Sequence, residues 1–281
     1  MSNETPVWLV TGCSSGLGRA IAEHALERGD RVAVTARDRT AVTDLVAGHG
    51  DRALALRLDV TDPASVASAV RACEETFGRV DVLVDNAGYG YLAAVEEGED
   101  AAVRALFETN VHGVVTVLRA VLPGMRARRS GRIVNVSSFG GLAAFAATGY
   151  YHATKFALEG LSESLAAEVA PLGIAVTIVE PGALRTRWAG ASMRQSPTRL
   201  DDYEQTAGKR RDATLAVSGR QPGDPARAAE AIAAVVDLDK PPLRLLLGSD
   251  ALAGARASLD RRRREIDRNE ALTRSADLEE T

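Results

Sequence analysis

Cysteine and histidine are scarce in this chain of 281 residues, and both shortages exclude classes of protein. Two cysteines, Cys13 and Cys73, are too few for a disulfide scaffold or a zinc site built from several cysteines. The four histidines are scattered without the spacing of metal ligands, so we expect no metal site.

Long apolar runs and an excess of charge of one sign are also missing. No window reaches about 18 apolar residues, and the first residues lack the basic and apolar stretches of a signal peptide. The chain has 34 basic and 38 acidic residues, a net charge of −4, which gives no reason to expect nucleic acid or an anionic membrane as a partner. We therefore expect a cytoplasmic protein without a transmembrane helix.

Hydrophobic residues make up 46% of the chain, enough for a sizeable core. Short β-branched runs alternate with longer helical stretches, and this alternation predicts an α/β protein. We expect a single domain over residues 1–281, with a doubly wound parallel sheet and helices on both faces. The predicted strands are Val7–Thr11, Arg31–Thr35, Ala53–Leu58, Val80–Val84, Arg132–Val136, Ile174–Val179 and Leu243–Leu247. The predicted helices are Gly16–Arg28, a stretch ending near Gly48, Pro63–Phe77, stretches between Asp100 and Arg129, Tyr151–Ala170 and Pro225–Val236.

Two segments depart from this alternation. Residues 184–223 are polar and too long for a plain connector, so we predict a substrate-binding loop, the alternative being a surface insertion with a short helix. Residues 255–281 form a charged tail, predicted to be a helical extension. Leu252, Leu259 and Ile266 lie seven residues apart near it, which suggests a helix that leans on the body or on a partner subunit.

A glycine-rich turn, Thr11–Gly18, follows the first predicted strand and opens a helix. Glycines let a phosphate approach the backbone, and the helix N-terminus offers free N–H groups. Gly12–Gly16 also matches G-x-S-x-G, the nucleophile elbow of hydrolases. That interpretation is weaker, because only one strand precedes the turn and Gly18 has no role in an elbow. The turn therefore predicts a dinucleotide site.

The end of the second strand indicates which dinucleotide binds. NAD-binding proteins place a carboxylate there to bond the ribose 2′-OH, whereas this chain has Ala36 followed by Arg37. A guanidinium favours the 2′-phosphate of NADP. The alternative is that Arg37 only solvates the strand end.

Tyr151 and Lys155 lie four residues apart in a predicted helix and so share one face. An ammonium group beside a phenol favours the phenolate and lowers its pKa. Ser138 ends a predicted strand, where its hydroxyl could hold a substrate oxygen. A Tyr-x-x-x-Lys pair alone is usually just a helix surface, but together with Ser138 and the glycine-rich turn it predicts an acid–base site.

With these motifs together, the chain resembles the short-chain dehydrogenase/reductase family, which has a three-layer Rossmann fold. TGCSSGLG, Arg37 and Val179–Gly182 are similar to the hydroxysteroid and retinol dehydrogenase branch. One departure is Ser15, where many NADP-using members carry a basic residue. The resemblance implies four catalytic residues: Asn110, Ser138, Tyr151 and Lys155. It assigns to the cofactor Gly12, Ser14, Ser15, Gly16, Leu17, Gly18, Arg37, Asp59, Val60, Asn86, Ala87, Gly88, Tyr151, Lys155, Pro181, Gly182 and Thr186.

The resemblance also implies a mechanism. NADPH delivers a hydride to a substrate carbonyl while Tyr151 donates the proton, and Ser138 bonds the carbonyl oxygen. Lys155 bonds the nicotinamide ribose and lowers the pKa of Tyr151, and Asn110 holds a relay water. We expect a homodimer or homotetramer acting on an apolar or aromatic small molecule; a non-catalytic NADP-binding regulator is the alternative. Candidate pocket residues are Tyr89, Tyr91, Leu92, Phe139, Leu142, Phe145, Trp188 and Met193.

Overall fold

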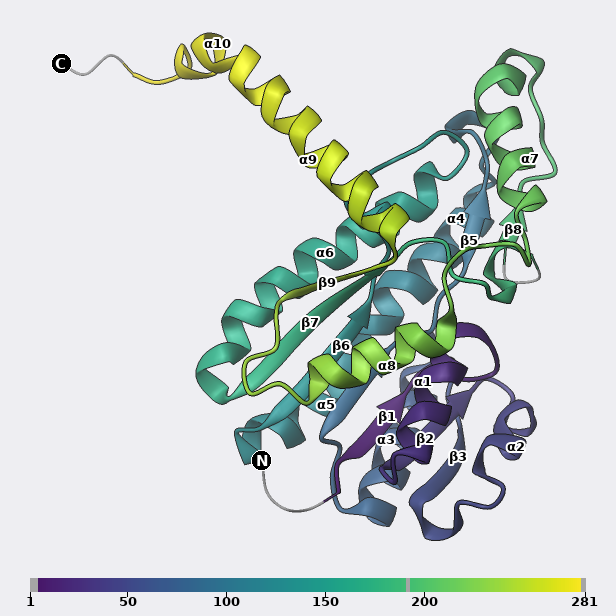
Figure 1. The fold of residues 1–281 in the computed structure, drawn as a ribbon, viewed down its shortest axis with the longest axis vertical. Coiled ribbons are helices and arrows are strands. Elements are labelled where there is room, and N and C mark those ends of the chain that lie inside the picture. The colour runs from purple at the N-terminus through teal and green to yellow at the C-terminus, as the bar shows by residue number, and fades with distance from the viewer. Residues whose placement is uncertain (1–4, 191–192, 279–281) are drawn as a thin grey trace.

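The computed structural model describes residues 5–190 and 193–278. Its main sheet has seven parallel strands in the order β3-β2-β1-β4-β6-β7-β9 (Figure 1). The strands are β1 (Val7–Val10), β2 (Arg31–Ala36), β3 (Ala53–Arg57), β4 (Val82–Asp85), β6 (Gly131–Val136), β7 (Ile174–Pro181) and β9 (Arg244–Leu247). The predicted doubly wound α/β fold is confirmed.

The two faces of the sheet build two separate cores. In β1, Trp8 and Val10 face one core while Val7 and Leu9 face the other, and all four are fully buried. Such strands read as continuous apolar runs because helices cover both faces. One face carries α1 (Gly16–Glu27), α2 (Thr43–Val46) and α8 (Pro225–Val236), and the other carries α3 (Pro63–Phe77), α5 (Gly113–Arg128) and α6 (Gly149–Val169).

The strand order reverses between β1 and β4, which are neighbours in the sheet. In a doubly wound sheet the connections leave on opposite faces at such a point and open a crevice beyond the carboxyl ends of the strands. The glycine-rich turn follows β1 and the segment Asn86–Gly88 follows β4, so the fold brings both to this crevice.

Two predicted helices are interrupted. The stretch expected to end near Gly48 is a 3-10 turn, η1 (Arg39–Val42), followed by the short α2. The long stretch after Asp100 consists of α4 (Asp100–Phe107), a π-helical turn, η4 (Glu108–His112), and α5. A π turn inserts one residue into the helix and is frequently found at functional sites.

The joined stretch Asp100–Arg128 is long and apolar enough to cross a membrane, judged by length and composition alone. The stretch is not an unbroken apolar run, because it includes Arg104, Glu108 and Arg119. Val114, Val117 and Leu118 of α5 belong to the core between the sheet and α3. This packing is typical of a core helix.

Residues 184–223 form an insertion between β7 and α8, and its two ends lie side by side. Leu184 forms an isolated bridge with Gly223, and the Arg185 N–H donates to the Gly223 carbonyl at 2.8 Å. Within the excursion, β8 (Met193–Gln195) pairs in parallel with β5 (Gly90–Leu92). The remaining elements are η7 (Arg187–Ala189), η8 (Asp201–Tyr203), a π turn η9 (Glu204–Gly208) and α7 (Lys209–Ala216). The segment thus has secondary structure of its own and is not an open loop.

The tail folds into α9 (Ser249–Arg268) and α10 (Glu270–Arg274). The first two thirds of α9 contact the body: the Ser258 hydroxyl and Arg262 Nη2 each donate to the Leu142 carbonyl at 2.9 Å, and the Arg262 guanidinium lies 5.1 Å from the centroid of the Phe156 ring. Beyond this contact α9 extends away from the domain (Figure 1). Leu259 and Ile266 are 55% and 69% exposed, so the apolar stripe lies on solvent rather than on the body.

Candidate active site

A hydrogen-bond network fastens the glycine-rich turn to the segment after β4. The Thr11 hydroxyl accepts hydrogen bonds from the N–H groups of Asn86 and Ala87 at 2.9 and 3.0 Å. In return, Asn86 Nδ2 donates to the carbonyls of Thr11 and Gly12 at 2.9 and 3.1 Å. Asn86 is therefore a brace of the turn.

The turn has the properties of a phosphate cradle. A β-carbon on Gly18 would lie 2.2 Å from Asn86 Nδ2, and Gly12 and Gly16 have φ values of +73° and +65°. The first turn of α1 holds no acidic residue, and Ser15 makes no side-chain cap there. The N–H groups at the start of α1 are thus left for an anion, and the residues present fit a dinucleotide pyrophosphate. The close approach of Asn86 gives Gly18 the role that a nucleophile elbow does not offer.

The end of β2 leaves one guanidinium without a carboxylate partner. Arg37 is exposed and forms no ion pair within the described residues, and Ala36 is buried. The nearest carboxylate along the chain, Asp38, accepts hydrogen bonds from the N–H and hydroxyl of Thr40 at 2.9 and 2.7 Å. Asp38 thus caps η1, and Arg37 is left exposed at this rim, where its charge helps to lower the pKa of Asp59.

The second part of the predicted cofactor site packs against the first. A β-carbon added at Gly16 would lie 3.4 Å from Cβ of Thr186. Pro181 ends β7, and the Gly182 N–H donates to the Leu247 carbonyl at 2.8 Å. The structure therefore brings the Pro181–Thr186 segment beside the glycine-rich turn. Asp59 and Val60 follow β3; Asp59 accepts hydrogen bonds from Thr61, and Val60 is buried.

Ser138, Tyr151 and Lys155 converge at the carboxyl end of β6. The Ser138 hydroxyl accepts a hydrogen bond from the Gly140 N–H at 3.0 Å and caps the 3-10 turn η5 (Phe139–Gly141). The same hydroxyl lies close enough to that of Tyr151 to favour its ionisation. Tyr151 and Lys155 are both buried, one turn apart on α6.

The electrostatics of this cluster differ from the expectation. Burial raises the pKa of Tyr151 to about 12, and the Ser138 hydrogen bond only partly opposes it. The Lys155 Nζ donates to the Val136 carbonyl at 2.8 Å and lies 5.8 Å from the centroid of the Tyr151 ring. Burial lowers the pKa of Lys155 to about 8, against the opposing charge of Glu159. In this arrangement, burial is the largest influence on the pKa of both Tyr151 and Lys155.

Asn110 lies in the π turn η4 and is fully buried. Its Oδ1 accepts from the Tyr89 N–H at 3.1 Å, and its Nδ2 donates to the Tyr89 carbonyl at 2.9 Å and to the Thr154 hydroxyl at 3.2 Å. Both amide hydrogens are therefore used. The side chain braces the strand-end segment after Gly88 against α6, a role that the sequence motif did not indicate.

The candidate pocket residues divide into two groups. The ring centroid of Trp188 lies 5.1 Å from that of Tyr151, and Phe145 lies 5.4 Å from His152, the residue after Tyr151. His152 is buried, accepts from the Phe145 N–H, and has its pKa lowered to about 4 by burial, so it stays neutral. By contrast, Tyr91 and Leu92 are core residues with 1% and 0% exposure. Trp188 and Phe145 are thus the aromatic residues that the structure places beside the catalytic group.

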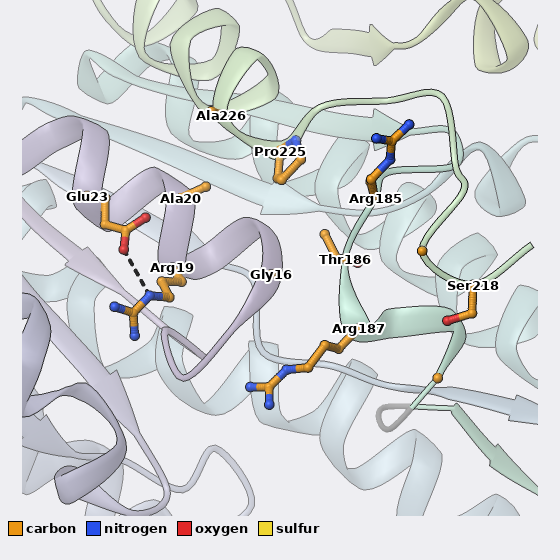
Figure 2. A pocket seen from close by; sticks show the side chains of 12 residues that line it. Gly16, Arg19, Ala20, Glu23, Arg185, Thr186, Arg187, Ser218, Pro225 and Ala226 are labelled. Atoms are coloured by element: carbon orange, nitrogen blue, oxygen red, sulfur yellow. Dashed lines mark hydrogen bonds and ion pairs between the residues drawn. The ribbon is translucent and has the colours of Figure 1, made fainter.

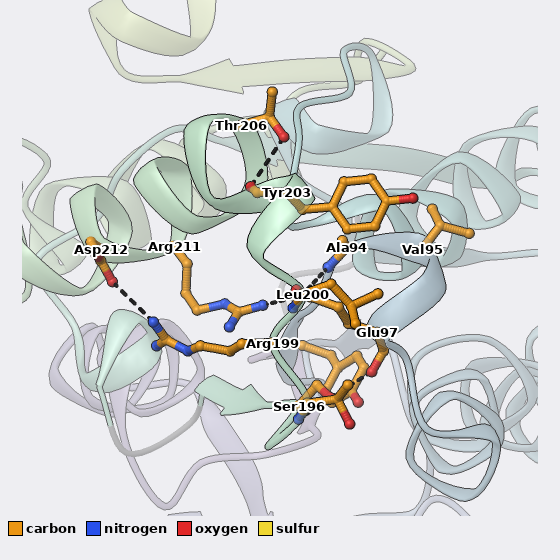
Figure 3. Close-up of polar contacts among 12 residues, drawn as sticks. Ala94, Val95, Glu97, Ser196, Arg199, Leu200, Tyr203, Thr206, Arg211 and Asp212 are labelled. Carbon is orange, nitrogen blue, oxygen red and sulfur yellow. Dashed lines mark hydrogen bonds and ion pairs between the residues drawn. The ribbon is translucent and has the colours of Figure 1, made fainter.

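A buried ion pair fixes residues 184–223 to the body, and sequence patterns gave no signal of it (Figure 3). Arg211 of α7 donates to the carboxylate of Glu97, with side-chain exposures of 1% and 3%. The same carboxylate accepts from the N–H groups of Ala94 and Leu200 at 3.0 Å each. Glu97 ends the 3-10 turn η3 (Val95–Glu97), which follows β5 closely. The pair therefore holds α7 against the η3 turn that follows β5.

We expect Glu97→Gln to destabilise the protein by about 3 kcal/mol, because it leaves the buried Arg211 charge unpaired. Denaturant unfolding measures this loss, and hydrogen exchange in residues 193–216 shows whether the segment opens first. Glu96→Gln is the matched control: Glu96 is exposed and accepts from the Tyr203 hydroxyl at 2.7 Å. Equal stability of the two variants would contradict the prediction.

A cavity of about 600 Å³ lies between the start of α1 and residues 184–223 (Figure 2). It is lined by Gly16 and Thr186 of the predicted cofactor set and by Arg19, Arg185 and Arg187. None of the four predicted catalytic residues borders it. The cavity therefore adjoins the cofactor side of the crevice.

Comparison with known proteins places this arrangement in a family. The short chain dehydrogenase profile matches residues 6–196. The oxidoreductase BOA17 of Botryotinia fuckeliana is 44% identical over 249 residues, covering 88% of this chain and 90% of that protein. Human retinol dehydrogenase 8 is 36% identical over 252 residues, covering 84% and 79% of the two chains.

Solved structures agree. A short-chain dehydrogenase from Streptomyces avermitilis is 48% identical, with a TM-score of 0.92 over 98% of this chain and all of that one. An alcohol dehydrogenase from Thermococcus sibiricus in complex with 5-hydroxy-NADP is 26% identical, with a TM-score of 0.71 over 87% and 96% of the chains. A 3-ketoacyl-(acyl-carrier-protein) reductase from Brucella melitensis complexed with NADH is 28% identical, with a TM-score of 0.73 over 86% and 96%. The chain belongs to the short-chain dehydrogenase/reductase family of oxidoreductases, and several of the similar solved structures contain a bound nicotinamide dinucleotide.

Proposed function

We propose that the protein is an NADP(H)-dependent oxidoreductase that interconverts a carbonyl and an alcohol on an apolar or aromatic small molecule. The observation that carries this proposal is the convergence of Ser138, Tyr151 and Lys155 beside a glycine cradle with an uncapped helix N-terminus. When bound, the nicotinamide supplies the hydride chemistry.

Tyr151 is the acid–base group in this proposal. Its buried hydroxyl faces Ser138, so a substrate oxygen placed between them receives a hydrogen bond from Ser138 and a proton from Tyr151. Because burial keeps the phenol protonated at neutral pH, the group is ready to donate in the direction of carbonyl reduction.

In this proposal Lys155 holds the cofactor's ribose, and its positive charge favours the ionised form of Tyr151. Its Nζ is a donor at the bottom of the crevice, held by one carbonyl and with hydrogens left for a hydroxyl ligand. A second anchor for its charge is Glu159, one turn further along α6. These contacts keep the ammonium beside Tyr151 in spite of its burial.

The aromatic neighbours support an apolar or aromatic substrate. Trp188 packs on the Tyr151 ring, and the Phe145 ring lies beneath the Arg210 guanidinium at 4.8 Å. Pockets with such linings favour apolar ligands over sugars. A screen of ketones and aldehydes for NADPH consumption tests the whole proposal; binding of NADPH without any turnover would instead support a non-catalytic regulator.

The expected preference for NADPH over NADH depends on Arg37. Arg37→Asp repels the 2′-phosphate and offers an acceptor to the 2′-OH of NADH, so the ratio of kcat/KM values should fall by about ten- to a hundredfold, the range of one charged hydrogen bond. The measurement is kcat/KM for both coenzymes at fixed ionic strength. Arg39→Asp, which removes an exposed charge two residues further on, is the control. If the wild type favours NADH, or if the ratio does not move, the assignment of Arg37 is wrong.

A further inference from the structure

Residues 184–223 carry the opposite charge from the rest of the protein. They hold eight basic and four acidic residues, a net charge of +4, within a chain whose net charge is −4. An apolar substrate gives no reason for this excess. A segment of this charge beside an anionic cofactor gives one.

Most of these cations already have partners inside the segment or on the body. Arg185 donates to the Gln221 carbonyl, Arg199 faces Asp212 at 4.0 Å, and Arg211 is paired with Glu97. Figure 2 shows Arg185 directed away from the start of α1. These contacts fasten the three side chains within the segment or against the body.

Two arginines instead reach the cofactor crevice. Arg187 Nη2 donates to the carbonyl of Ser14, at the tip of the glycine-rich turn, at 3.4 Å. Figure 2 shows its side chain reaching from η7 toward the start of α1. The Arg194 guanidinium lies 4.4 Å from the ring centroid of Tyr89, directly after Gly88. Both are exposed, and neither forms an ion pair with a carboxylate in the described residues.

The backbone fixes both positions. Thr186 lies against Gly16 and accepts from the Trp188 N–H at 3.2 Å, which places Arg187 beside the turn. Arg194 lies in β8, paired with Tyr91 of β5, with Met193 buried below it. Burial raises the pKa of Tyr89 and the charges of Arg194 and Arg37 oppose this rise, so both guanidinium groups lie near Tyr89.

We propose that Arg187 and Arg194 form a second, cationic wall of the dinucleotide site, so that residues 184–223 bind the cofactor's pyrophosphate as well as enclosing the substrate. The inference builds on the proposed use of a nicotinamide dinucleotide. The glycine-rich turn supplies N–H donors from one side, and the two guanidinium groups supply charge from the other.

The test measures dissociation constants for NADPH, NADH and ADP-ribose in wild type, Arg187→Ala, Arg194→Ala and the double variant. ADP-ribose keeps the pyrophosphate but lacks nicotinamide. Each single variant should bind all three ligands about tenfold more weakly, the scale of one screened charged hydrogen bond. The effect should shrink as the ionic strength rises to about 0.15 M. Arg199→Ala removes the same charge from the same segment away from the crevice and should bind as the wild type does.

Hydrogen exchange gives a readout that does not depend on activity. Cofactor should slow exchange in residues 193–216 of the wild type and of Arg199→Ala, but much less in the double variant. If the wild type binds and reduces substrates while both arginine variants keep wild-type affinities, the cationic wall is refuted and the proposed function stands. If the wild type binds none of the three ligands, both proposals fail.

Discussion

Replacing Tyr151 by phenylalanine should lower turnover at least about 100-fold, the typical effect of a lost general acid. The substitution removes one oxygen from a fully buried ring and leaves the packing against Trp188 in place. The substrate oxygen would still meet Ser138 but would have no proton donor. The dissociation constant of NADPH should change little, because the aromatic ring and Lys155 remain. Single-turnover reduction of the best ketone, with NADPH bound in advance, measures the effect.

Tyr150 offers a matched control for this prediction. Its hydroxyl donates to the Val95 carbonyl at 2.5 Å, on the opposite side of the helix start from Lys155. Tyr150→Phe makes the same chemical change one residue away and should keep turnover within a few-fold of wild type. A Tyr151→Phe enzyme that turns over like Tyr150→Phe would show that another group donates the proton.

Replacing Lys155 by methionine should weaken cofactor binding by about ten- to a hundredfold, the range expected for one charged hydrogen bond. It should also lower kcat, since Tyr151 loses a nearby positive charge that favours its ionised form. Both effects are expected together because one Nζ serves both purposes. Titration of NADPH and pre-steady-state kinetics separate the two.

Stability distinguishes this loss from unfolding. Burial lowers the pKa of Lys155 from 10.5 to about 8. Below pH 8 the folded protein therefore holds a charge that burial disfavours, and this cost fades as the pH rises from about 8 to 10.5. Methionine removes the cost at neutral pH but leaves the Val136 carbonyl without its donor. We expect the two effects to offset, so that Lys155→Met melts close to the wild type, as does the exposed control Lys240→Met. Unchanged cofactor affinity in Lys155→Met would contradict the prediction.

Where capping residues mark the end of a helix, the sequence by itself determined where that helix begins or ends. The predicted helix Pro63–Phe77 has the observed bounds because Asp62 accepts from the Ala64 N–H, Pro63 fits the first turn and Gly78 takes a φ of +87°. Asp224 and Pro225 act in the same way at the start of α8. Such signals lie within a few residues of the element that they end, so a sequence shows them directly.

The tertiary structure decided everything that depends on residues far apart in the chain. The pair Glu97–Arg211 spans 114 residues and the contact of Arg187 with Ser14 spans 173, and neither leaves a local pattern. The π turn that aims Asn110 at Tyr89 also escaped the sequence pattern, because a one-residue insertion does not change helical periodicity noticeably. The sequence named Tyr151 and Lys155 as partners from their spacing. Only the fold set the direction of their pKa shifts, because desolvation depends on how many other segments surround a group, and here it is the largest influence on both.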